Sequence, residues 1–193
     1  MNTFSELNLS PVLKTNLARH GFVEPTPVQA ESIPPALAGR DIVATAQTGT
    51  GKTLAFVLPM LDLLAKHRTT AGIRAVVLSP TRELAQQIAE TFSKLAPGTG
   101  LRAACVVGGL NENTQLKAIR SGAQVLIATP GRLRDFLDRN LVQLGGVSLL
   151  VLDEADRMLD MGFLPAIQFI TGKMPAQRQN LLFGKSVKVL HGG

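Results

Sequence analysis

The stretch Ala46-Gln47-Thr48-Gly49-Thr50-Gly51-Lys52-Thr53 decides the fold, because it has the composition of a loop that holds phosphate groups. It follows the apolar run 41–45 and leads into a helical pattern that begins at Thr53. A strand, a glycine-rich turn and a helix in this order turn backbone N–H groups toward an anion at the helix N-terminus. In such a loop Lys52 reaches the β- and γ-phosphates and the Thr53 hydroxyl binds Mg²⁺. The simpler alternative is a glycine-rich turn with an exposed lysine.

Two carboxylates follow a second apolar strand, 147–152, about a hundred residues further along the chain. They open the segment Asp153-Glu154-Ala155-Asp156. A phosphate loop combined with acids at a strand end makes a site for a nucleotide with Mg²⁺. On their own, the acids could equally be the N-cap of a helix. The presence of both patterns in one chain favours the nucleotide site.

Length and composition bound the class of protein. The chain has 193 residues, of which 45% are hydrophobic and 18% charged, so we expect one soluble globular domain with a substantial core. We find no apolar run long enough to span a membrane and no secretory signal at the N-terminus. The net charge of +6 suits a polyanionic partner. Without Trp or Tyr, a base-stacking surface is not expected, so a bound nucleic acid should be held by its backbone.

The single cysteine and the histidines carry no predicted chemistry. Cys105 lies in an apolar run and is expected to be a small core residue in a reducing compartment, which favours the cytoplasm. The three histidines are scattered along the chain without the spacing of metal ligands.

Short apolar runs alternate with helical patterns along the whole chain. Candidate strands cover residues 41–45, 75–79, 102–107, 124–128, 148–152 and 180–183. Candidate helices cover residues 10–20, 28–37, 52–66, 81–95, 111–121, 131–139, 155–160 and 165–171. This alternation predicts an α/β fold, a mainly parallel sheet with helices on both faces in three αβα layers. Right-handed crossovers then bring every strand-to-helix loop to one edge of the sheet, where ligands bind in open α/β sheets.

The domain boundaries follow from this pattern. Residues 1–40 form an N-terminal helical segment of the same domain, in which Pro25 and Pro27 make a rigid turn before a helix that contains Pro34 and Pro35. Residues 41–183 form the phosphate-loop domain, and residues 184–193 form a tail.

Taken in order, six motifs resemble the N-terminal RecA-like domain of DEAD-box RNA helicases, especially the bacterial RhlE-like group. They are the Q motif Gly21–Gln29 with the upstream aromatic Phe4, the phosphate loop with Ala46 at its start, Pro80-Thr81-Arg82-Glu83-Leu84-Ala85, Gly108-Gly109, Thr129-Pro130-Gly131-Arg132, and Asp153-Glu154-Ala155-Asp156. The resemblance covers nearly the whole chain, from Phe4 to about Phe183.

The resemblance implies a role in ATP binding and hydrolysis for one set of residues. Gln29 reads the adenine edge and Phe22 packs on the adenine face, unless Phe22 only staples the local turn. Asp153 reaches Mg²⁺ through water, and Glu154 orients and deprotonates the attacking water, with Lys52 as the third catalytic residue. Asp156 ties its segment to neighbouring ones, or is simply an exposed acid in the first turn of a helix. The implied nucleotide-binding set is Phe22, Thr26, Gln29, Ala46, Gln47, Thr48, Gly49, Thr50, Gly51, Lys52 and Thr53, with Thr53 and Asp153 at the metal.

A second set of residues is implied to contact the sugar-phosphate backbone of RNA with little sequence preference. It comprises Pro80, Thr81, Arg82, Gly108, Gly109, Thr129, Pro130, Gly131 and Arg132. The alternative for the two arginines is a structural ion pair, with Glu83 or Asp135 among the nearby candidates.

Two departures from the family limit the expected activity. Where the family continues Ser-Ala-Thr after Phe183, this chain has Gly184-Lys185-Ser186 and then a tail that matches nothing in the family, which suggests an altered or added end. The second RecA-like domain, which supplies arginines and half of the RNA cleft, is missing. We therefore expect the chain to bind ATP with Mg²⁺, to hydrolyse it slowly and not to separate RNA strands.

Two other functions remain open from the sequence. The chain could be a truncated, non-enzymatic module that binds nucleotide or RNA. It could also be another P-loop ATPase without an RNA role, although the Q motif and Thr129–Arg132 argue against that. The oligomeric state, the RNA target and the protein partners are not encoded in these motifs.

Overall fold

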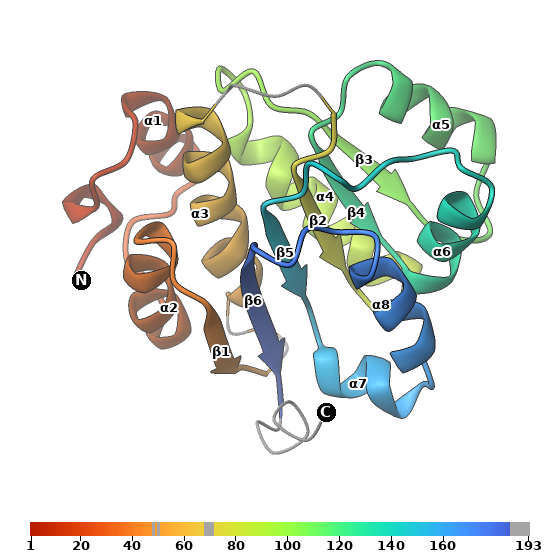
Figure 1. The fold of residues 1–193 in the computed structure, drawn as a ribbon. Helices are drawn as coiled ribbons and strands as arrows, with labels where there is room; N and C mark the ends of the chain where they lie inside the picture. The colour runs from red at the N-terminus through yellow and green to blue at the C-terminus, as the bar shows by residue number, and fades with distance from the viewer. Residues whose placement is uncertain (48, 50, 68–71, 186–193) are drawn as a thin grey trace.

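The computed structural model describes residues 1–47, 49, 51–67 and 72–185, and they fold around one sheet (Figure 1). Its six strands are parallel and lie in the order β1-β6-β5-β2-β4-β3. Thus β6, the last strand along the described chain, lies between β1 at the sheet edge and β5. The predicted parallel α/β architecture is confirmed.

The strands occupy the predicted positions to within a few residues. They are β1 (Ile42–Thr45), β2 (Ala75–Leu78), β3 (Ala103–Val106), β4 (Val125–Ala128), β5 (Leu149–Leu152) and β6 (Gln179–Gly184). One difference concerns the predicted tail, because β6 continues through Gly184, which pairs with Thr45 of β1. The strand therefore includes the first residue of the segment 184–193.

The helices cover the two faces of the sheet as separate groups. The first face carries α1 (Pro11–Arg19), α2 (Pro27–Leu37), α3 (Lys52–Lys66) and α4 (Arg82–Leu95), preceded by the short 3₁₀ helix η1 (Phe4–Glu6). The second face carries α5 (Glu112–Arg120), α6 (Pro130–Asp138), α7 (Ala155–Asp160) and α8 (Leu164–Thr171). The result is the predicted three-layer arrangement.

The alternation of side chains along each strand explains the two cores. In β2, Val77 faces the core under α1–α4, whereas Val76 and Leu78 face the core under α5–α8. All three side chains are fully buried. Burying a valine or leucine contributes about 1.5–3 kcal/mol, so both layers contribute to holding the central strands.

The N-terminal segment is attached to the sheet domain by specific contacts. Asn16 of α1 is buried, and its side-chain amide donates hydrogen bonds to the carbonyls of Leu95 at 2.9 Å and Pro97 at 2.8 Å. The helix α2 continues through Pro34 and Pro35, as the sequence required. The contacts of Asn16 attach α1 to the end of α4. Among the described helices, none has the length and apolar character needed to cross a membrane.

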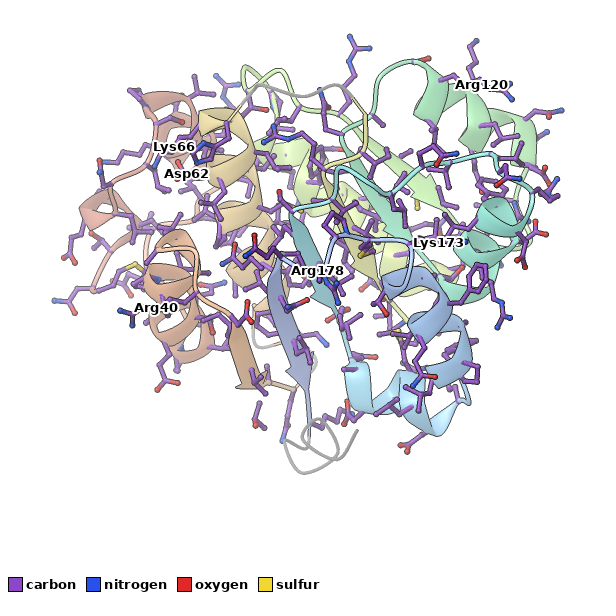
Figure 2. The ribbon with its side chains drawn as sticks, in the orientation of Figure 1. Arg40, Asp62, Lys66, Arg120, Lys173 and Arg178 are labelled. Carbon is purple, nitrogen blue, oxygen red and sulfur yellow. The ribbon has the colours of Figure 1, made fainter. Side chains whose placement is uncertain are left out.

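One buried charge lies away from the strand ends. The carboxylate of Asp62 in α3 is 1% exposed and forms an ion pair of 2.7 Å with the ammonium group of Lys66, one turn further along the helix. In Figure 2 both residues lie near the C-terminal end of α3, the end opposite to the one that begins at the phosphate loop. This pair therefore belongs to the scaffold and not to the candidate site.

Candidate functional site

The phosphate loop connects β1 directly to α3, in the context that the sequence predicted. Ala46 is buried, and its N–H donates a hydrogen bond of 2.9 Å to the carbonyl of Gly184, which ties the start of the loop to β6. Gln47 is exposed. Thr48 and Thr50, which the sequence placed in the nucleotide set, lie outside the described residues. Gly49 and Gly51 have φ angles of +86° and +80°, a region that glycine enters without strain.

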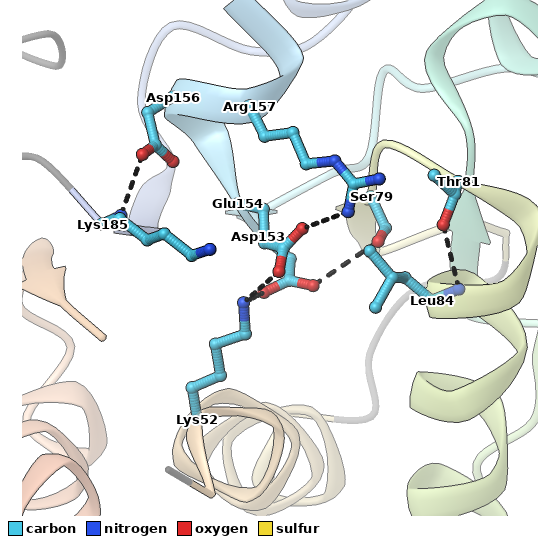
Figure 3. A network of polar contacts seen from close by, with 9 residues as sticks. All are labelled: Lys52, Ser79, Thr81, Leu84, Asp153, Glu154, Asp156, Arg157 and Lys185. Carbon is cyan, nitrogen blue, oxygen red and sulfur yellow. Dashed lines mark hydrogen bonds and ion pairs between the residues drawn. The ribbon is translucent and has the colours of Figure 1, made fainter. Parts of the chain in front are cut away.

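Lys52 is the centre of a buried charge cluster (Figure 3). Its ammonium group lies 3.0 Å from Asp153 Oδ1 and 3.2 Å from Glu154 Oε1. All three side chains are at most 8% exposed. A buried lysine between two carboxylates is a cation that a phosphate group can recruit, since phosphate offers the same oxygen partners. Thr53 follows it in the first turn of α3 and is half-buried.

Burial dominates the electrostatics of Asp153. Desolvation raises the pKa of its carboxyl group above the ordinary value, and the positive charge of Lys52 opposes that rise. The hydroxyl of Ser79, which is fully buried at the end of β2, donates a hydrogen bond of 3.4 Å to Asp153 Oδ2. Ser79 at the end of β2 therefore helps to orient Asp153 at the end of the neighbouring strand β5.

Glu154 adopts an unusual backbone conformation. Its φ and ψ angles are both 51°, in the left-handed region, and it immediately precedes α7. Such a conformation is uncommon outside glycine, asparagine and aspartate, and costs about 1–2 kcal/mol. Its second carboxylate oxygen accepts a hydrogen bond of 3.1 Å from Arg157, three residues further on. The strained turn and the two cations fix the carboxylate in the site.

Asp156 connects α7 to β6. Its Oδ2 accepts a hydrogen bond of 3.0 Å from the backbone N–H of Lys185, and the residue is only half-exposed. The prediction that Asp156 ties its segment to a neighbour is thus confirmed over the alternative of a freely exposed acid. Gly184 makes this approach possible, because a Cβ atom there would lie 2.8 Å from Asp156 Oδ1.

Gln29 joins the start of α2 to the phosphate loop. Its carbonyl oxygen accepts a hydrogen bond of 2.9 Å from the N–H of Thr26, and its amide group donates one of 2.9 Å to the carbonyl of Gly51. The side chain is buried. A glutamine amide has two N–H groups and two acceptor lone pairs, so one of each remains beyond these two bonds.

The aromatic residues of the N-terminal segment pack differently from each other. Phe4 is 3% exposed and belongs to the core. Phe22 is half-buried and lines a pocket of about 170 Å³ together with Phe4, Leu17 and Val23. Phe22 therefore combines a structural role in the local turn with one accessible side.

Gly51 should be intolerant of a side chain. A Cβ atom there would lie 2.5 Å from Gln29 Nε2, and φ is +80°. We expect Gly51→Ala to lower the free energy of unfolding by about 2–3 kcal/mol, because it combines backbone strain with loss of a buried hydrogen bond. Chemical denaturation measures this. Gly39→Ala is the matched control, because φ there is +81° but nothing lies within 4 Å, so only the strain of about 1 kcal/mol applies. Equal losses in both variants would disprove the Gln29 contact.

A second group of predicted residues meets in a groove beside this site. Six of the nine residues implied in RNA contact line it, namely Pro80, Arg82, Gly108, Thr129, Gly131 and Arg132, together with Asp135 and Phe163. The groove has a volume of about 480 Å³. Thr81 and Thr129 are the residues that precede α4 and α6, so two helix N-termini face this edge. Backbone N–H groups at helix N-termini favour anions such as phosphate.

The remaining members of this second group, Thr81, Gly109 and Pro130, are next in sequence to residues that line the groove. Pro130 is buried at the first position of α6. Gly109 has a φ of +78°, and a Cβ atom there would lie 2.8 Å from Arg82 Nη1. Glycine at this position therefore leaves room for the Arg82 guanidinium group.

The two arginines of the groove have different partners. Arg82 forms the predicted ion pair with Glu83 at 3.5 Å, but both side chains are largely exposed, so the pair contributes little. Arg132 does not pair with Asp135, which instead forms an ion pair of 2.6 Å with Arg139. The guanidinium of Arg132 donates to Gln115 Oε1 at 3.2 Å and to the carbonyl of Leu110 at 3.4 Å. Among the described residues, neither Glu83 nor Asp135 forms an ion pair with Arg132, which is held by neutral acceptors instead.

Sequence reasoning missed two residues of the charge cluster. Ser79 orients Asp153, and Arg157 holds Glu154. Their signals were present, since Ser79 is the polar residue at the end of a buried strand and Arg157 lies one helical turn after Glu154. Cys105, expected in the core, is instead half-buried on the edge strand β3, and burial raises the pKa of its thiol.

Comparisons with known proteins agree on one family. The sequence model described as DEAD/DEAH box helicase matches residues 26–185. The chain is 45% identical over 184 residues to proteins named DEAD-box ATP-dependent RNA helicase CshA from two strains of Streptococcus pneumoniae. That match covers 95% of this chain and 35% of each relative, so the chain spans about a third of their length. A crystal structure of a DEAD box protein from the hyperthermophile Methanococcus jannaschii superposes with a TM-score of 0.91 at 36% identity, over 98% of this chain and 52% of that one.

Proposed function

Because this chain belongs to the DEAD/DEAH box helicase family, we propose that it is the N-terminal, ATP-binding RecA-like domain of an ATP-dependent RNA helicase. The observation that carries the proposal is the position of two sites along one sheet edge. The cluster of Lys52, Asp153 and Glu154 lies beside a groove lined by two arginines and two helix N-termini. A nucleotide and a nucleic-acid backbone can thus be held next to each other.

The phosphates of ATP are assigned to the loop 46–53. Its backbone N–H groups and the N-terminus of α3 receive the β- and γ-phosphates, and Lys52 leaves the carboxylates to pair with them. Asp153 and Glu154, which pair with Lys52 in this structure, are then available to other positive groups. The contact between Gln29 and Gly51 couples this loop to the adenine end of the site.

The residues fit Mg²⁺. Asp153 supplies a buried carboxylate oxygen whose charge is neutralised here by Lys52, and Thr53 supplies a hydroxyl at the start of α3. No cluster of three or more metal-binding side chains occurs among the residues described, and none is needed, since Mg²⁺ keeps several waters and binds substrate phosphates. When bound, Mg²⁺ neutralises charge that develops on the phosphates.

Glu154 is the proposed general base. Its carboxylate is 6% exposed, held by Lys52 and Arg157, and presented by a left-handed backbone. A carboxylate fixed next to the phosphate site can accept the proton of an attacking water. Asp156 contributes by holding the end of β6 in place.

RNA is assigned to the groove beside the charge cluster. Arg82 extends over Gly109, whereas Thr81, Thr129 and Gly131 place helix N-termini at the same edge. Contacts of this kind hold phosphates without reading bases, so we expect little sequence preference. Contacts to the 2′-hydroxyl would distinguish RNA from DNA.

Adenine recognition by Gln29 and Phe22 gives the test of the proposed function. In a calorimetric titration with Mg²⁺ we expect ADP and AMP to bind and GDP not to bind. We expect Gln29→Ala to weaken ADP binding about tenfold or more, because it removes a bidentate amide and the contact with Gly51. Gln177→Ala, at an exposed glutamine on the loop before β6, is the control. Equal binding of ADP and GDP would contradict the assignment.

Several finer assignments are part of the same proposal. We place the chain in the RhlE-like group on its motifs, in the cytoplasm on its single cysteine, and in a longer protein whose second RecA-like domain completes the ATPase and RNA sites. Without that domain we expect slow hydrolysis and no strand separation, measurable by phosphate release and by a duplex-unwinding assay.

A non-enzymatic module that binds nucleotide or RNA is the second candidate. ADP binding with no phosphate release, even after addition of the family's second domain as a separate chain, would support it.

A further inference from the structure

The order of the strands places Lys185 between the two halves of the ATP site. The strand β6 lies between β1 and β5. Gly184 pairs with Thr45, the residue before the phosphate loop, and Leu182 pairs with Leu152, the residue before Asp153. The residue that follows Gly184 therefore leaves the sheet between the phosphate loop and the acidic pair.

The backbone at this point is held from both sides. The carbonyl of Gly184 accepts a hydrogen bond of 2.9 Å from Ala46, and the N–H of Lys185 donates one of 3.0 Å to Asp156 Oδ2. Figure 3 shows the Lys185 side chain extending from this position toward the cluster of Lys52, Asp153 and Glu154. The backbone position from which the Lys185 side chain starts is thus held by bonds to both neighbouring segments.

The charges around the cluster leave Lys185 available for an anion. Lys52 pairs with both acids, and Arg157 pairs with Glu154. Within the described part of the chain, the ammonium group of Lys185 forms no ion pair, and the residue is exposed. Lysine combines a compact positive charge with a flexible stem, which suits contact with a phosphate group.

We propose that Lys185 contacts the γ-phosphate of ATP and makes the site prefer triphosphate over diphosphate. This inference rests on the proposed function, because it requires ATP on the loop 46–53. It adds a residue that the resemblance does not supply, since the family has alanine at this position. Lys185 would provide, from within the chain, a cation at the terminal phosphate.

The expected effect is selective for the terminal phosphate. Water and dissolved ions weaken the attraction between an exposed lysine and a phosphate. We therefore expect Lys185→Met to weaken binding of a β,γ-imido ATP analogue about five- to twentyfold. Binding of ADP should change less than about twofold, because ADP lacks the group that Lys185 contacts. Lys185→Arg should keep the preference, and raising the salt concentration should reduce it.

The test is a calorimetric titration of the wild-type chain and these variants with Mg²⁺, using the imido analogue and ADP. Lys94→Met, at an exposed lysine of α4, is the control and should change neither affinity. Equal affinities of wild type and Lys185→Met for the analogue, or equal losses for the analogue and ADP, would overturn the inference while ADP binding upheld the proposed function. If the wild type bound neither ligand, the proposed function would fail, and the role of Lys185 with it.

Discussion

Lys52→Met should lower the free energy of unfolding by about 3–5 kcal/mol, because it removes the cation that pairs with the buried Asp153 and one of the cations that pair with Glu154. It should also abolish nucleotide binding, since the phosphates lose the side chain that replaces their counterion. Chemical denaturation and a titration with ADP measure the two effects. Lys94→Met tests whether loss of any lysine has the same consequence.

The loss of stability in Lys52→Met should depend on pH in a predictable direction. Burial raises the pKa of Asp153, and Lys52 opposes the rise, so removing Lys52 raises this pKa further. A carboxyl group whose pKa is higher in the folded state than in the unfolded state binds a proton more readily when folded. A fall in pH therefore stabilises the folded state. The stability difference between wild type and Lys52→Met should therefore shrink from pH 7 toward pH 5. A deficit that stays constant over this range, or one below about 1 kcal/mol, would show that Lys52 does not neutralise the buried acids.

Glu154→Gln should reduce ATP hydrolysis at least about a hundredfold while ADP affinity changes only a few-fold. Glutamine keeps the size of the side chain and one acceptor oxygen for Lys52 or Arg157, but it cannot accept the proton of water. Phosphate release in a single turnover, with RNA present, measures the rate.

The matched control for this variant is Glu90→Gln, at an exposed glutamate of α4 far along the helix from the site. It should hydrolyse ATP at the wild-type rate. Hydrolysis by Glu154→Gln at the rate of this control would remove Glu154 from its proposed role, and Asp153 would be the next candidate for the base.

Much of the fold could be predicted because its signals are local. Each strand is a short apolar run, and each loop at the site contains glycine, proline or a polar residue directly after such a run. The helix boundaries were accurate for the same reason, for example at Asn111, whose side chain accepts a hydrogen bond from Thr114 at the start of α5. Parallel pairing then brought the predicted loops to one edge.

The partners of charged side chains could not be predicted in the same way. Asp135 is close in sequence to both Arg132 and Arg139, and only the packing of α5 against α6 brings Glu112 to Arg139 and Gln115 to Arg132. The left-handed backbone of Glu154 is likewise invisible in the sequence, because glutamate rarely adopts it without support from its surroundings.

The sequence by itself determined the phosphate loop, the acidic strand end, the alternation of strands and helices, and the family. Only the tertiary structure decided which of these residues meet. Lys52 and Glu154 are 102 residues apart in the chain, and Ser79 and Asp153 are 74 apart. Their contacts depend on the order in which the strands pair, because β2 lies next to β5 and only β6 lies between β1 and β5. The physical reason is that strand order arises from the packing of whole crossover units, which no local stretch of sequence encodes.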